Sequence, residues 1–113
     1  MSPQLSQLAF VFPGQGSQAP GMLVELAARQ PEITETFAEA SEAIGVDLWS
    51  MAQAPDDVRL NQTEFTQPAL LAGGIAVWRT WRARNGAPPT WLAGHSLGEY
   101  TAHVAAGALS LTD

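Results

Sequence analysis

The sequence predicts an α/β fold in which short parallel strands lie among flanking helices. Two short apolar runs, at residues 8–12 and 91–93, have the length of strands and lead into turns that contain glycine. The stretches between and after them have helical spacing, so the order of elements is strand, helices, strand, helix.

The first strand is expected at Leu8–Phe12, because this run is apolar throughout and rich in residues that favour strands. Pro13 and Gly14 stop it. A run without polar alternation indicates a strand that is buried on both faces. The pattern then becomes helical from Gly21 through Gln30.

A second helix is expected to begin at Pro31 and to end at Gly45, since proline favours the first helical position and glycine the end. Its apolar stripe consists of Ile33, Phe37, Ala40 and Ile44. Residues 46–64 sustain no period, so we expect a loop there with one short helical turn.

A long helix follows, with Pro68 in its first turn and Asn85-Gly86 at its end. The face expected to be buried consists of Leu71, Ile75, Trp78 and either Trp81 or Arg82. We interpret Thr66 and Gln67 as a cap for this helix rather than as ligand-binding residues.

Three arginines, Arg79, Arg82 and Arg84, lie near the end of the long helix, where its negative pole favours cations. We expect a solvated helix end there in preference to a docking patch. Ser110–Asp113 has the pattern of another helix start, so we expect the chain to be part of a longer polypeptide.

Composition limits the class of protein. With 113 residues, 46% of them hydrophobic, the chain suits one small soluble domain. Its net charge of -6 argues against binding to nucleic acid. The absence of cysteine excludes disulfides, a thiolate nucleophile and cysteine metal sites. Neither a membrane span nor a secretory signal is recognisable, so we expect a cytoplasmic protein.

Gly94-His95-Ser96-Leu97-Gly98 fits the G-x-S-x-G pattern of a nucleophile elbow. It lies between the second strand, expected at Trp91–Ala93, and a helix that reaches about Gly107, as this motif requires. Such a turn projects the serine hydroxyl at the end of the sheet, and the following helix points its positive end at the reacting oxygen. Ser96 is therefore the candidate nucleophile. The simpler alternative is a tight turn in which Ser96 only caps the helix.

A glycine-rich loop, Pro13–Gln18, follows the first strand, where open α/β sheets bind their ligands. Acyl transfer passes through a tetrahedral oxyanion, and each well-aimed N–H donor contributes on the order of 10²–10³ in rate. We assign the two donors to the N–H groups of Leu97 and Gln15. Gly14 and Gly16 flank Gln15 and belong to the same candidate site.

The same loop has an alternative interpretation. Gly14, Gly16 and Ala19 also fit a dinucleotide-binding loop. Pro20-Gly21 interrupts the helix that such a loop requires, and no second strand with a terminal acid follows, so we favour the oxyanion role.

Neither histidine suits the role of general base for Ser96. His95 immediately precedes the serine in the turn, so its side chain is expected to project elsewhere and to shape the pocket. His103 lies roughly 10 Å along the helix at about 1.5 Å per residue, beyond the reach needed for proton transfer. We expect His103 to be a packed or surface residue and the base to lie outside this chain.

Three motifs, at Phe12–Gln18, Thr66–Ala69 and Gly94–Tyr100, closely resemble those of malonyl-CoA:acyl carrier protein transacylases, and the resemblance spans essentially the whole chain. Acyltransferase domains of polyketide synthases carry the same signatures. The resemblance implies an α/β-hydrolase-like core with an inserted ferredoxin-like subdomain. Residues 1–113 would form the N-terminal portion of that core, which is incomplete without downstream residues.

The resemblance further implies that Ser96 takes a malonyl group from coenzyme A as an ester and passes it to the phosphopantetheine thiol of acyl carrier protein, for fatty acid biosynthesis. Gln15 and Leu97 match the oxyanion positions of the family, and three more residues match its motifs: His95, Gln67 and Glu99. Malonyl-CoA is then the substrate, acyl carrier protein the partner, and no cofactor is bound permanently. A serine hydrolase of the same core fold is the alternative.

The family's base histidine, and the arginine that pairs with the malonate carboxylate, lie downstream of the matched region. Malonyl preference therefore follows only from overall likeness, because a bidentate arginine is what selects a dicarboxylic acyl group. We expect residues 1–113 alone to be inactive and poorly stable, with apolar surface exposed.

Overall fold

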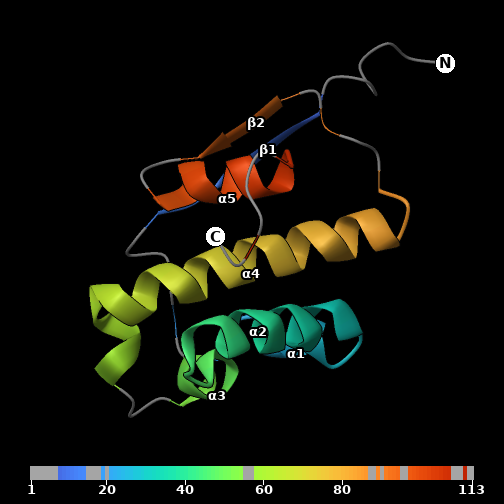
Figure 1. Ribbon diagram of the computed structural model, residues 1–113. Coiled ribbons are helices and arrows are strands. Elements are labelled where there is room, and N and C mark those ends of the chain that lie inside the picture. Colours follow the sequence, from blue (N-terminus) through green and yellow to red (C-terminus); the bar gives the residue numbers. More distant parts are fainter. Residues whose placement is uncertain are drawn as a thin grey trace, which may run out of the picture.

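The computed structural model describes residues 8–14, 19, 21–54, 58–86, 89, 91–94, 97–107 and 111. Its elements, in chain order, are β1 (Ala9–Phe12), α1 (Val24–Ala27), α2 (Pro31–Ile44), α3 (Leu48–Gln53), a 3₁₀ helix (Val58–Asn61), α4 (Thr63–Ala83), β2 (Trp91–Gly94) and α5 (Leu97–Ala105). The strands and α5 lie on one side of α4, and α1, α2 and α3 lie on the other (Figure 1). The predicted mixture of helices with a small parallel sheet is therefore confirmed.

The sheet consists of β1 and β2, which pair in parallel with Ala9 opposite Trp91 and Phe12 opposite Gly94. One face packs on the helices: Phe12 is buried, and the ring of Phe10 lies 5.2 Å from that of Trp78 on α4. The opposite face is open, because Val11 is 73% exposed and Trp91 is 69% exposed. The prediction of a strand buried on both faces is therefore wrong for this chain, since helices cover only one face of β1.

Helix α2 has the predicted bounds. Pro31 is its first residue, and Gly45 ends it in a left-handed conformation (φ 74°), with its N–H donating to the Ser41 carbonyl at 2.8 Å. Glycine adopts this conformation without steric cost. Three residues of the predicted stripe are buried, whereas Ile44, at the very end of the helix, is exposed.

Residues 46–64 contain more structure than expected. Asp47 caps α3, because its carboxylate accepts hydrogen bonds from the Ser50 N–H at 3.1 Å and the Ser50 hydroxyl at 2.8 Å. These hydrogen bonds hold the pKa of Asp47 below its usual value. The N–H of Leu48 also donates to the Ser41 hydroxyl of α2 at 2.9 Å, which joins α3 to its neighbour.

Helix α4 begins at Thr63, so Pro68 lies inside the helix rather than in its first turn. The proline there removes one internal backbone hydrogen bond. Thr66 is not a cap either: it is buried within the helix, and its hydroxyl donates to the Gln62 carbonyl at 3.0 Å. The predicted end is confirmed, because α4 stops at Ala83 and Asn85 adopts a left-handed conformation.

The buried surface of α4 is wider than one stripe, because α2 packs against one side of it and α5 against the other. The core cluster on the α2 side draws on three helices and includes Ile33, Phe37, Leu48, Ala52, Ala69, Ala72, Ile75 and Ala76. Small residues on α4 allow this close approach on both sides. Trp81, in contrast, is partly exposed.

The arginines near the end of α4 connect it to α2. The Arg79 guanidinium lies 2.7 Å from the Glu39 carboxylate, and that of Arg84 lies 3.4 Å from Glu32. Arg82 instead lies over the ring of Trp78, 5.8 Å from its centroid. Arg79 and Arg84 thus link α4 to α2, whereas Arg82 contacts its own helix. Separately, none of the helices in the described ranges combines the length and apolarity needed to cross a bilayer.

Candidate functional site

Ser96, His95, Gln15 and Gly16 lie outside the described residues. Of the other predicted site residues, Gly14 and Leu97 are buried, and Gln67 is exposed in the amino-terminal half of α4. The geometry of the site therefore follows from the residues on either side of the elbow and of the glycine-rich loop.

The two glycines of the elbow are in close contact. A methyl group built on Gly94 would overlap the carbonyl of Gly98 and the N–H of Glu99. The end of β2 and the first turn of α5 therefore approach so closely that a side chain cannot fit between them. This is the steric condition that a nucleophile elbow requires of its neighbours.

Gly98 also contacts the end of the other strand. A methyl group on it would overlap the Phe12 carbonyl and would lie 2.9 Å from the Pro13 carbonyl. The first turn of α5 thus packs directly against the point where β1 gives way to the glycine-rich loop. The prediction that the N–H groups of Leu97 and Gln15 bind one oxyanion requires these two segments to be adjacent. The described residues that flank them, Gly98 and Pro13, are in contact.

Leu97 is the first residue of α5. The N–H groups of a helix's first turn have no acceptor within the helix, and they carry its positive partial charge. The carboxyl ends of both strands and the amino end of α5 lie on the same side of the molecule (Figure 1). An oxyanion held beside Leu97 would therefore meet a donor and a favourable field.

Residues 21–22, which follow the glycine-rich loop in the sequence, are attached to α3. The N–H of Gly21 donates to the Ala52 carbonyl at 2.9 Å, and the side-chain amide of Gln53 donates to the Met22 carbonyl at 3.0 Å. Pro13 thus lies at the end of the sheet, and Gly21 lies beside the helices on the other side of α4. No sequence pattern predicted this attachment.

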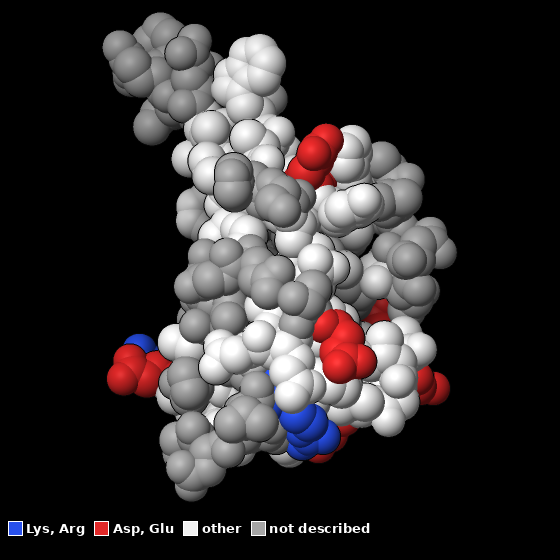
Figure 2. Space-filling model, turned by 90° about the vertical axis from the view of Figure 1, so that its left-hand side faces the viewer, with Lys and Arg blue, Asp and Glu red and all other residues white. Residues whose placement is uncertain are grey.

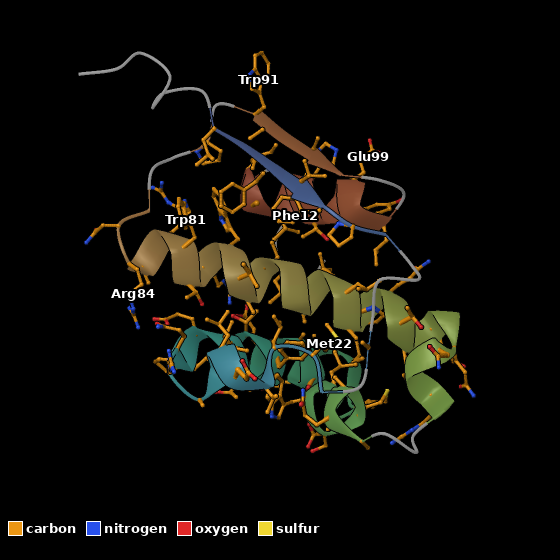
Figure 3. The ribbon with its side chains drawn as sticks, turned by 180° about the vertical axis from the view of Figure 1, so that it is seen from behind. Phe12, Met22, Trp81, Arg84, Trp91 and Glu99 are labelled. Atoms are coloured by element: carbon orange, nitrogen blue, oxygen red, sulfur yellow. The ribbon has the colours of Figure 1, made fainter. Side chains whose placement is uncertain are left out.

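Two glycines of α4 allow neighbouring side chains to pack closely against it. A methyl group on Gly73 would lie 3.1 Å from the Met22 side chain, and one on Gly74 would lie 2.7 Å from Thr101 and 3.3 Å from Phe12. Figure 3 shows Phe12 between the sheet and α4, with Met22 on the other side of the helix. An apolar groove of about 310 Å³ lies between β1, residues 22–23 and α4.

His103 is a surface residue, as predicted. Its imidazole is exposed and lies 3.9 Å from the Glu99 carboxylate one turn earlier on α5. Glu99 and Tyr100 are exposed as well, next to the elbow. In the described part of the chain, no group of histidine and acidic side chains is arranged to hold a metal ion.

The arrangement argues against a dinucleotide-binding loop. Such a loop leads directly into a helix whose amino end holds the pyrophosphate. Here α1 begins only at Val24, contains four residues and is preceded by Leu23 in a left-handed conformation. Along the described residues, the chain reaches its second strand only at Trp91.

The described residues on the side that carries the strand ends are mostly uncharged. Figure 2 shows this side, and its described residues include separate acidic groups and few basic ones. The arginines near the end of α4 do not form a free basic patch, since Arg79 and Arg84 pair with Glu39 and Glu32.

Known proteins resemble the chain throughout its length. A family model described as an acyl transferase domain matches residues 9–113. The malonyl CoA-acyl carrier protein transacylase of Salmonella typhimurium is 54% identical over 109 residues, which cover 96% of this chain and 35% of that protein.

Solved structures agree with this match. A crystal structure of malonyl-CoA:acyl carrier protein transacylase from Xanthomonas oryzae pv. oryzae is 66% identical, with a TM-score of 0.91, over 95% of this chain and 34% of that one. The solved structure of a type II PKS acyl-carrier protein in complex with its malonyl-transacylase includes a chain that is 51% identical to this one, with a TM-score of 0.91. The match covers 95% of this chain and 35% of that one. This chain thus spans about a third of the length of the relatives that it matches.

Proposed function

The chain belongs to the acyl transferase domain family, and on that basis we propose that the whole protein transfers a malonyl group from malonyl-CoA to acyl carrier protein. The single observation that carries this proposal in the structure is the contact of Gly98 with the end of β1. It supports the placement of the nucleophile elbow beside the glycine-rich loop. The similarity to malonyl transacylases supports the choice of acyl group and acceptor.

In the proposed reaction, the Ser96 hydroxyl attacks the thioester carbonyl and loses its proton to a base supplied by the rest of the protein. The N–H groups of Leu97 and Gln15 donate to the tetrahedral oxyanion. Coenzyme A leaves as its thiol after taking up a proton, and the malonyl group remains as a serine ester. The phosphopantetheine thiol of the carrier protein then attacks this ester and restores the serine hydroxyl.

The proposal includes a division of labour within the whole protein. Residues 1–113 are the N-terminal portion of an α/β-hydrolase-like core, and the remaining polypeptide supplies the base histidine, the carboxylate-binding arginine and a ferredoxin-like subdomain. The open face of the sheet, with Val11 and Trp91 exposed, supports a core that extends further. Residues 1–113 alone are then inactive.

Acyl carrier protein is the proposed partner, in line with the solved structure of a relative in complex with its acyl-carrier protein. Carrier proteins of this pathway are acidic, and the described residues around the strand ends offer few cations (Figure 2). We therefore place the basic residues that face the carrier protein elsewhere in the whole protein.

Intact-mass measurement of the whole protein after incubation with malonyl-CoA tests the proposal. We expect a malonyl adduct that Ser96→Ala abolishes, that Ser50→Ala on α3 leaves intact, and that is lost when carrier protein bearing phosphopantetheine is added. Rapid release of free malonate without a carrier protein would favour a serine hydrolase instead. No adduct on the native protein would contradict the proposal.

A further inference from the structure

We propose that the pocket between α2 and α3 binds the guanidinium group of an arginine side chain or of a small guanidinium compound. The pocket has a volume of about 390 Å³ and is lined by Thr34, Ala38, Ser41, Asp47 and Trp49. These residues belong neither to the elbow nor to the glycine-rich loop. The inference therefore does not depend on the proposed function.

One wall of the pocket is an aromatic ring that is held in place. The Trp49 ring lies 5.1 Å from that of the fully buried Phe37, and the two planes meet at 65°. Trp49 itself is only partly buried, so it can both pack on the core and contact a ligand. The face of an indole ring attracts cations, and a flat guanidinium group stacks on it. Ala38, on α2, adds apolar surface with little bulk.

The charges around the pocket are negative. Asp47 contributes a carboxylate whose pKa is held below its usual value by hydrogen bonds from Ser50. The pocket also reaches the last turn of α2, where the helix dipole is negative and no basic residue is present. Glu42, in the same turn, adds a further negative charge. The amino end of α3 has the opposite polarity but contributes less, because α3 has six residues and α2 has 14.

Among the described residues, no ion pair offsets this charge. Two other glutamates of α2 pair with arginines of α4. Glu42 and Asp47 have no such partner in the described ranges of the chain. A cation bound in the pocket would supply the positive charge that the carboxyl end of α2 lacks.

The groups that line the pocket favour an organic cation over a metal ion. Calcium takes about six to eight oxygen ligands, whereas this pocket offers one carboxylate and the hydroxyl groups of Thr34 and Ser41. The Ser41 hydroxyl already accepts a hydrogen bond from the Leu48 N–H at 2.9 Å. A guanidinium group needs less, because one carboxylate and one aromatic face are enough to orient it.

Titration of the whole protein with ethylguanidinium, followed by two-dimensional NMR, tests the inference. We expect saturable shifts of the Trp49 indole N–H signal and of the backbone amide signals of α2 and α3. Asp47→Asn keeps a capping oxygen and should raise the dissociation constant by about threefold to fivefold, as when an exposed ion pair is lost. Ala38→Phe, at an exposed position, should fill the pocket and abolish the shifts. Circular dichroism checks that both variants remain folded.

Two further measurements identify the interaction and the source of the ligand. Glu25→Gln removes one negative charge from α1, outside this pocket, and should leave the dissociation constant at its native value. A short peptide with one arginine serves as the second ligand. Binding at least as tight as that of ethylguanidinium would identify a partner protein's arginine as the ligand, whereas weaker binding would identify a small molecule.

Two results would overturn the inference. One is the absence of saturable shifts at the pocket residues with millimolar ethylguanidinium. The other is equal binding by the native protein, Asp47→Asn and Ala38→Phe, which would mean that the net charge of -6 attracts cations without a specific site. Neither result would affect the proposed function, because the titration does not measure acylation.

Discussion

The two sides of α4 differ in how completely they are packed. On the α2 side, Phe37, Ile33 and Leu48 are fully buried in one core. On the sheet side, Val11 and Trp91 are 73% and 69% exposed on the face of the sheet that points away from the helices. The larger buried core therefore lies on the α2 side, while the candidate catalytic segments lie on the side that is less well covered.

The glycine-rich loop connects these two sides. Before it, Phe12 and Pro13 lie beside Gly98, and after it, Gly21 and Met22 form hydrogen bonds with Ala52 and Gln53. Substitutions on the two sides should accordingly separate loss of activity from loss of stability.

The largest effect is expected at Gly98, on the sheet side. In Gly98→Ala the new methyl group would collide with the Phe12 carbonyl and push the loop away from the elbow. We expect the acylation rate of the whole protein to fall by about 10²-fold or more, as when an oxyanion donor is lost. Single-turnover intact mass measures this rate. A native rate in this variant would mean that the two segments need not touch.

The next comparison sets Phe37 against Val11. Phe37→Ala leaves a cavity in the helical core and should lower the free energy of unfolding by about 3–5 kcal/mol. Val11→Ala in the 113-residue chain should change it by less than about 0.5 kcal/mol, because Val11 is already exposed. Urea titration followed by circular dichroism measures both. Equal losses in the two variants would contradict the difference in packing.

Local signals in the sequence predicted much of this arrangement. Pro31 and Gly45 mark both ends of α2, and the two apolar runs became β1 and β2. The elbow pattern and the glycine-rich loop predicted that these two segments lie close together, and the contact of Gly98 with the end of β1 agrees with this prediction.

Other features could not be predicted, because their local sequence signals are weak or because they depend on contacts between residues far apart in the sequence. Helix α3 is only six residues long, and its signal is limited to the Asp47 cap and four apolar residues. The start of α4 has no side-chain cap at Gln62, and Pro68 indicated a later start because proline usually occupies the first turn. The bond between Gln53 and Met22 joins residues far apart in sequence, so only tertiary structure reveals it.

A smaller effect is expected from the paired glycines of α4. In Gly74→Ala the methyl group would lie 2.7 Å from the buried Thr101, and the crowding should cost about 1–3 kcal/mol of unfolding free energy. Gly73→Ala is the matched control, because its methyl group meets the flexible end of Met22 at 3.1 Å. The gain in helix propensity, up to about 1 kcal/mol, should offset that contact. Thermal unfolding of both variants measures the two effects. A larger loss of stability in Gly73→Ala than in Gly74→Ala would contradict the prediction.

The smallest effect is expected at Asp47. Asp47→Ala should lower the free energy of unfolding by about 1 kcal/mol at neutral pH, because the α3 cap is lost. The pKa of Asp47 is lowered in the folded state, so the stability from its charge is present above its ordinary value of 3.8 and is lost as pH falls through the folded pKa. Asp47→Asn keeps a capping oxygen without this titration. The difference in unfolding free energy between the native chain and Asp47→Asn should therefore disappear at acidic pH. A difference that stays constant with pH would exclude the charge effect.

A crystal structure of the whole protein trapped as its malonyl ester tests the central claim most directly. The account predicts that the ester carbonyl oxygen on Ser96 lies about 2.7–3.1 Å from the backbone nitrogens of both Leu97 and Gln15. An ester on another residue, or a carbonyl oxygen that points away from these two N–H groups, would contradict it.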